Sequence, residues 1–322
     1  MRTVIAALAA VMIAAPACAQ QILGIATNPQ GTAAYSTGAA IARVLEDKSP
    51  LKARPQPVGG SSTYLPMVNN RDMDFGLANL TEAMWAYSGT GTFEGKPNPN
   101  LRLAFVTYGV PSAITVAADS PYKAIADLKG ARMPSEFAAQ TIFKALQDAM
   151  LANGGLSMAD MKPFPVRNYT DGLRALQESR VDAAVAGAST AVVTEINSAM
   201  SGRGGVRYVP VAMDPDAVKR TRAVMPGFYI QVLQPSPTLA GVKEPMPVMH
   251  NSFLLVAGAH VPDETIYVVV KTMHANKDAL IDSFTAFRGF DPARMNEAAA
   301  VPYHPGAERF YREAGQWPPL SR

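Results

Sequence analysis

Short apolar runs alternate along the chain with longer segments whose apolar residues recur every three or four positions. The first pattern is typical of buried strands, and the second of helices with one buried face. In the first third it predicts strands at 22–26, 52–58, 73–79 and 101–106, and helices at 32–47 and 64–70. Further on it predicts strands at 114–118, 164–166, 181–186, 208–211 and 253–258, and helices at 135–153, 170–180, 189–200, 262–276 and 305–314. This rhythm favours an α/β fold built on open, mostly parallel sheets.

The start of the chain has a different pattern. Met1-Arg2 precede an apolar run over 4–15, and Pro16-Ala17-Cys18-Ala19 follow. A positive start, an apolar stretch of about a dozen residues and an A-x-A end predict a secretory signal peptide over 1–19. Lipidation of Cys18 is the alternative, although Ala15 is smaller than the residue such a site favours. Cleavage after Ala19 places the protein in the periplasm.

Composition excludes several classes of function. Hydrophobic residues make up 48% of the chain and charged residues 17%, which favours a packed core. The net charge of +3, without a long run of like charge, argues against nucleic-acid binding. With one cysteine and four widely separated histidines, the chain lacks a disulfide framework and an HExxH-type metal motif. We therefore expect a monomer with no metal and no cofactor.

Two α/β units joined by irregular segments predict two lobes with a cleft between them. The first lobe is expected to hold 21–108 and 225–322, and the second 109–224. The crossings between the lobes are placed near 107–111 and 226–232, and 226–247 is expected to be irregular. Ligands of open α/β sheets bind beyond the carboxyl ends of the strands, where helices begin.

Small polar residues stand at these predicted helix starts. Thr32 follows Gly31, and Ser61 and Ser62 follow a glycine pair. Hydroxyls and free N–H groups at a helix start suit an anion, but each residue is equally explained as a simple helix cap. Asn79, at the end of a predicted strand, offers an amide that both donates and accepts hydrogen bonds. Weaker candidates are the aromatic ring of Tyr229, on the second crossing, and the guanidinium groups of Arg102 and Arg167.

Several ordered motifs resemble the TAXI family of solute receptors, which serve TRAP transporters. The motifs are Gly31-Thr32 with Tyr35, Gly59-Gly60-Ser61, the loop GTGTFEGKP at 89–97 and the HPGA-containing segment at 303–311. The resemblance covers nearly all of the chain after the signal peptide. It implies a two-lobed periplasmic binding protein (type II-like) that performs no covalent chemistry. Such a receptor captures a small organic anion or amino acid, closes about a hinge, and delivers the solute to an ion-gradient-driven TRAP permease.

One turn departs from the family pattern. Where many members carry a glycine-rich Ser-Gly-Thr turn, residues 134–141 read PSEFAAQT, and only Thr141 matches. Phe137 and Gln140 would then face or flank the cleft, which predicts a ligand with one anionic end and a less polar remainder. The predicted ligand-binding residues are Thr32, Tyr35, Ser61, Ser62 and Asn79 on the first lobe, Phe137, Gln140 and Thr141 on the second, and Tyr229 on the crossing.

Two other functions stay open at this stage. The same binding fold can serve a sensor or another class of transporter. A hydrolase would need Ser61 or Ser62 as nucleophile with His304 as base, but the GxSxG elbow is absent from the sequence.

Overall fold

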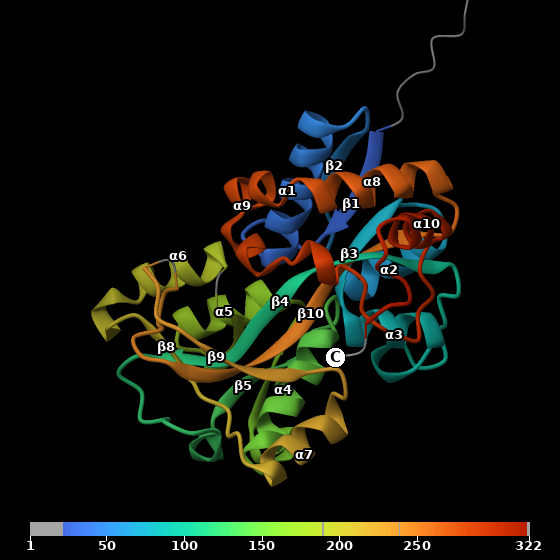
Figure 1. The fold of residues 1–322 in the computed structure, drawn as a ribbon. Helices are drawn as coiled ribbons and strands as arrows, with labels where there is room; N and C mark the ends of the chain where they lie inside the picture. Colours follow the sequence, from blue (N-terminus) through green and yellow to red (C-terminus); the bar gives the residue numbers. More distant parts are fainter. Residues whose placement is uncertain (1–21, 189, 238, 321–322) are drawn as a thin grey trace, which may run out of the picture.

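The computed structural model describes residues 22–188, 190–237 and 239–320, so the predicted signal peptide lies outside the described residues. An eight-stranded mixed sheet runs through this part of the molecule (Figure 1). Its strands are β1 (Ile22–Thr27), β2 (Lys52–Pro57), β3 (Phe75–Asn79), β4 (Leu101–Ala117), β7 (Ala183–Gly187), β8 (Val206–Val209), β9 (Tyr229–Leu233) and β10 (Met246–Gly258). Strands β5 (Arg132–Glu136) and β6 (Lys162–Val166) form a separate parallel pair.

Helices cover the sheet on both faces. They are α1 (Ala33–Lys48), α2 (Ser61–Asn69), α3 (Leu80–Ser88), α4 (Ile142–Asn153), α5 (Tyr169–Gln177), α6 (Ala191–Ala199), α7 (Pro215–Val224), α8 (Asp263–Ala275), α9 (Lys277–Ser283) and α10 (Pro305–Glu313). In the described part of the chain, no helix combines the length and the apolar content that crossing a membrane requires.

Buried apolar side chains divide the described residues into two lobes. One cluster joins β1, β3, α1–α3 and α8–α10 with the first part of β4, up to Tyr108. Two further clusters pack the second part of β4, from Ala113, against α4–α7 and their strands. Since burial of apolar surface drives folding, each lobe has its own core. Figure 1 shows the first lobe at the top, with the N- and C-terminal colours, and the second lobe below it.

The connections between the lobes differ from the prediction. The strands predicted at 101–106 and 114–118 are one strand, β4, which passes through both lobes. Strand β10 returns beside it, antiparallel, from Met249 opposite Ser112 to Gly258 opposite Leu101. The second crossing is therefore β10, whereas 226–232 contributes to β9, which pairs with β10 in the second lobe. Met225 and Phe228 likewise pack in a second-lobe core. β9 was not predicted, because the prolines and glycines on either side of it are typical of irregular segments.

The direction of the strands also corrects an expectation. β1 is parallel to β2 and β3, as predicted. The long strands β4 and β10, however, are antiparallel to each other and to their other neighbours. Instead of two mostly parallel sheets, one mixed sheet thus continues from lobe to lobe.

The helix predicted over 135–153 begins later, at Ile142. Ser135 and Glu136 end strand β5, and the chain then turns with positive φ angles of 68° at Glu136 and 47° at Phe137. Positive φ is the conformation that glycine adopts most easily. The turn thus has a glycine-like backbone without glycine.

Candidate functional site

A cavity of about 80 Å³ lies between the two lobes. This is well above the ~10–15 Å³ that a single water requires, so the cavity has room for a few waters or a small ligand. Its polar lining consists of Asn28, Thr32, Ser61, Tyr64, Asn79, Glu82, Ser112, Tyr169, Thr190 and Asn251. Its apolar lining includes Leu77, Val110, Ile142, Phe143, Leu146 and Phe253. Both lobes therefore supply polar and apolar walls.

Several helices begin at this cavity, which explains why small polar residues gather there. Thr32 caps α1, accepting a hydrogen bond from the Tyr35 N–H at 3.3 Å, and Asn79 caps α3, accepting from the Glu82 N–H at 2.9 Å. Ser61 is the first residue of α2, and Thr190 directly precedes α6. The free N–H groups of a helix start give this end of the cavity a positive potential.

The lobes touch each other beside the cavity. The Ser62 hydroxyl lies 2.7 Å from the Thr141 hydroxyl and accepts a hydrogen bond from the Thr141 N–H at 3.0 Å. The Val192 N–H donates to the Gly31 carbonyl at 3.2 Å. A methyl group at Gly60 would stand 2.0 Å from the Ala139 carbonyl oxygen. The lobes thus meet closely around the cavity.

Aromatic rings form the second-lobe wall. The Phe143 ring lies 4.8 Å from the Tyr169 ring and 6.1 Å from the Phe137 ring, between ring centroids. The side-chain oxygen of Gln140 accepts from the Tyr169 N–H at 2.7 Å. Phe137 and Gln140 therefore support Phe143 and Tyr169, which line the cavity.

The structure separates the predicted site residues into groups. Thr32, Ser61 and Asn79 line the cavity, whereas Ser62 and Thr141 join the lobes beside it. The Tyr35 hydroxyl accepts from the Gln30 amide outside the cavity. Tyr229 lines a separate groove, where its ring stacks on His250 at 5.4 Å. The role of each in ligand binding stays a prediction.

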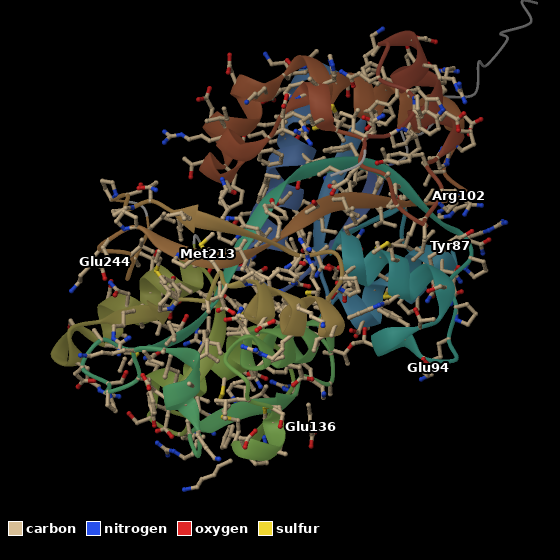
Figure 2. All side chains as sticks on the ribbon, turned by 60° about the horizontal axis from the view of Figure 1, so that its bottom comes forward. Tyr87, Glu94, Arg102, Glu136, Met213 and Glu244 are labelled. Atoms are coloured by element: carbon tan, nitrogen blue, oxygen red, sulfur yellow. The ribbon has the colours of Figure 1, made fainter. Side chains whose placement is uncertain are left out.

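The guanidinium groups of Arg102 and Arg167, which were weaker candidates for ligand binding, lie elsewhere. The Arg102 guanidinium donates to the carbonyl oxygens of Pro99 and Leu101, at the outer edge of the first lobe (Figure 2). The Arg167 guanidinium pairs with Asp171 at 3.1 Å and is largely exposed. Neither side chain belongs to the cavity lining.

Among the buried polar lining residues that escaped the sequence analysis, two have side-chain atoms without a hydrogen-bond partner. Glu82, in α3, is 1% exposed, and burial raises the pKa of its carboxyl to about 8, although a hydrogen bond with the Ser61 side chain opposes this rise. Asn251 lies in the polar stretch His250–Ser252 between the apolar parts of β10, and its side-chain nitrogen and oxygen both lack a partner among the described residues. A polar residue inside an apolar strand was the available signal for Asn251. For Glu82 the available signal was Asn79 three residues before it, the spacing of a helix N-cap, but α3 was not predicted.

Metal binding finds no support in this geometry. Within residues 22–188, 190–237 and 239–320, no three His, Cys, Asp or Glu side chains lie together in a way that would hold a metal ion.

Solved structures of similar fold define the class. A periplasmic transporter superimposes with a TM-score of 0.56 at 11% identity, over 94% of this chain and 95% of that one. PhnD1 from Prochlorococcus marinus, in complex with methylphosphonate, gives 0.55 at 13% identity, over 92% and 98%. These likenesses confirm the predicted fold class, a two-lobed periplasmic binding-protein fold. The profile of the NMT1-like family matches residues 25–315, and the chain belongs to that family.

Proposed function

We propose that this protein is an extracytoplasmic solute receptor, which binds a small organic molecule between its lobes and presents it to a membrane transporter. The observation that carries the proposal is the interlobe cavity with the buried, unpartnered amide of Asn251. Burying a polar group without a hydrogen bond is costly, so such a group is expected where a ligand completes it.

The fold and its neighbours support the same function. Binding-protein folds hold their ligands between two lobes, and hinge closure signals the bound state. The fold neighbours include PhnD1 with its methylphosphonate. The predicted signal peptide would place the receptor in the periplasm.

For the transporter, we favour a TRAP permease of the TAXI type. The ordered motifs support this choice, since Gly31-Thr32 and Gly59-Gly60-Ser61 lie at the interlobe surfaces. The HPGA segment has a structural role, because His304 caps α10, accepting from the Gly306 N–H at 3.3 Å. His304 is buried there, outside the cavity lining, so it is not placed to act as the base that a hydrolase with Ser61 would need.

Native mass spectrometry of freshly purified protein tests the receptor function. We expect a mass above that of the polypeptide, and release of one small solute on denaturation. The released solute should also raise the melting temperature of emptied protein, and the rise should grow with the logarithm of the solute concentration above its Kd. If neither a copurifying solute nor a stabilising one from a periplasmic extract is found, the receptor function is wrong.

Uptake measurements then identify the transporter class. Cells that express the receptor should accumulate the labelled solute. Uptake that collapses when the ion gradient is dissipated, while ATP is maintained, supports a TRAP permease. Uptake that follows ATP instead would assign the receptor to an ABC-type importer, and binding without uptake would favour a sensor.

A further inference from the structure

The cavity contains a carboxyl group that the proposed function does not yet use. Glu82 is the third residue of α3, its side chain is 1% exposed, and it lines the cavity. Its Oε1 atom has no hydrogen-bond partner in the part of the chain that the structure describes. An acceptor oxygen of this kind calls for a donor that the protein itself does not supply.

Positive charge to balance Glu82 is missing from the cavity wall. Among the described residues, the lining includes no lysine, arginine or histidine, and its other titratable groups are the hydroxyls of Tyr64 and Tyr169. Burial raises the pKa of both tyrosines above their ordinary value of 10, so neither hydroxyl changes charge near neutral pH. Burying a carboxylate without a partner is strongly unfavourable.

The rest of the cavity shows what else the ligand needs. The Asn251 amide is 3% exposed, and its donor and its acceptor both lack partners in the described structure. Ala33 and Ala34 border the cavity at the start of α1, where their N–H groups have no intrahelical acceptor. One region of the cavity therefore favours an anionic group, whereas Glu82 favours a cationic one.

We propose that Glu82 determines ligand specificity by pairing its carboxylate with a protonated nitrogen of the solute, while Asn251 binds a neighbouring polar group. The inference rests on the proposed receptor function. It narrows the expected ligand with one anionic end to a compound that also carries an ammonium group, and it disfavours dicarboxylates, whose second carboxylate offers Glu82 no cation to pair with. The raised pKa of Glu82, about 8, agrees with a carboxyl whose cationic partner is absent.

Four probes of matched length test this pairing. L-Norvaline and 5-aminopentanoate carry an ammonium group, whereas pentanoate and glutarate do not. Thermal shift and titration calorimetry on wild-type protein should show that one of the two ammonium probes binds at least about 10-fold more tightly than pentanoate and glutarate. A charged pair contributes at least about 10-fold in affinity.

Two variants assign the preference to one side chain. Glu82→Gln keeps the shape of the side chain and removes its charge, and it should abolish the 10-fold preference while the protein still unfolds cooperatively. Glu94→Gln is the matched control, because Glu94 is exposed at the surface of the first lobe (Figure 2). This control should bind like wild type.

Failure of the inference is distinguishable from failure of the receptor function. Equal or tighter binding of pentanoate or glutarate, or an unchanged preference in Glu82→Gln, overturns the role of Glu82 and leaves the receptor intact. A copurified solute without a basic nitrogen does the same. If none of the four probes binds and no solute copurifies, both proposals are wrong.

Discussion

Ser62 and Thr141 connect the two lobes through a pair of hydrogen bonds. Their hydroxyl oxygens are 2.7 Å apart, and the Thr141 N–H donates to the same Ser62 oxygen at 3.0 Å. Ser62 stands in the first turn of α2, and Thr141 directly precedes α4. One hydroxyl of the first lobe thus satisfies the start of a second-lobe helix, and the contact bridges the two lobes.

The contact predicts that substitutions of Ser62 and Thr141 have coupled effects on solute affinity. Ser62→Ala should weaken solute binding by roughly 2- to 10-fold, because a hydrogen bond contributes about 0.5–1.5 kcal/mol. Thr141→Val tests the hydroxyl from the other side. In a double-mutant cycle measured by calorimetry, the combined variant should lose less affinity than the sum of the single losses. Strictly additive losses would show that the bond is not made in the bound state.

Gly60 is predicted to be required for closure. A methyl group there would stand 2.0 Å from the Ala139 carbonyl oxygen and 2.1 Å from the Gln140 side chain, both in the second lobe. Gly60→Ala should therefore reduce affinity by more than about 10-fold, while the separate lobes stay folded. Gly59→Ala is the control, since its methyl group would make an ordinary contact at 3.5 Å. Equal affinity of the two variants would contradict the prediction.

Asn251 is predicted to lower the folding stability of the ligand-free protein and to raise its affinity for the solute. Replacing it with leucine removes two unsatisfied buried atoms at similar volume, so the free energy of unfolding of ligand-free protein should rise by about 1 kcal/mol or more. Solute affinity should fall at the same time. Chemical denaturation and calorimetry measure the two effects. A variant that is less stable and binds normally would show that Asn251 has only a packing role.

The buried carboxyl of Glu82 predicts how stability changes with pH. Burial raises its pKa from an ordinary value of 4.5 to about 8 in the folded protein, so between these values the folded state holds one more proton than the unfolded state. Raising the pH from 5 to 8 should therefore destabilise the protein by up to about 1.4 kcal/mol per pH unit.

The comparison with Glu82→Gln isolates this effect. Burial lowers the pKa of His274 and His304, which adds the opposite slope below pH 6.5 in both proteins. The difference between wild type and variant, from urea denaturation at pH 5, 6, 7 and 8, should thus carry the Glu82 contribution alone. A constant difference would mean that the carboxyl titrates normally.

Glu136 offers a stabilising substitution. This exposed residue has a φ of 68°, in the left-handed region (Figure 2). Glu136→Gly should raise the free energy of unfolding by roughly 0.5–1 kcal/mol, because a side chain in this conformation costs about 1–2 kcal/mol and glycine recovers part of it. Glu136→Ala removes the same side-chain atoms beyond Cβ but keeps the strain, so it should give no such gain in thermal denaturation.

Local patterns predicted those elements whose ends the chain marks clearly. Thr32 after Gly31 correctly predicted the start of α1, and the apolar run ending at Asn79 correctly predicted β3. The helix α3 was missed, because it starts at Leu80, directly after β3, with no turn residue between them. The position of Glu82 in the cavity depends on that helix, and the N-cap spacing of Asn79 and Glu82 was the local signal that was overlooked.

The connection between the lobes was misread for a different reason. Gly109 and Pro111 resemble a break between two strands, and β4 nevertheless continues through them. Pro111 stands opposite His250 in the ladder with β10, a pairing between residues far apart in sequence. Such partners decide whether a proline interrupts a strand, and a sequence pattern does not contain them.

The pairing of β4 with β10 has a mechanical consequence. The two segments that join the lobes are bonded to each other along the ladder, with register shifts between Phe253 and Leu254 and between Leu255 and Val256. Sliding one strand along the other would break the ladder, whereas bending and twisting at the bulges preserve it. The joint therefore resists sliding and leaves bending and twisting as the motions between the lobes. A partner that touches both lobes would sense solute occupancy as a change in their relative orientation.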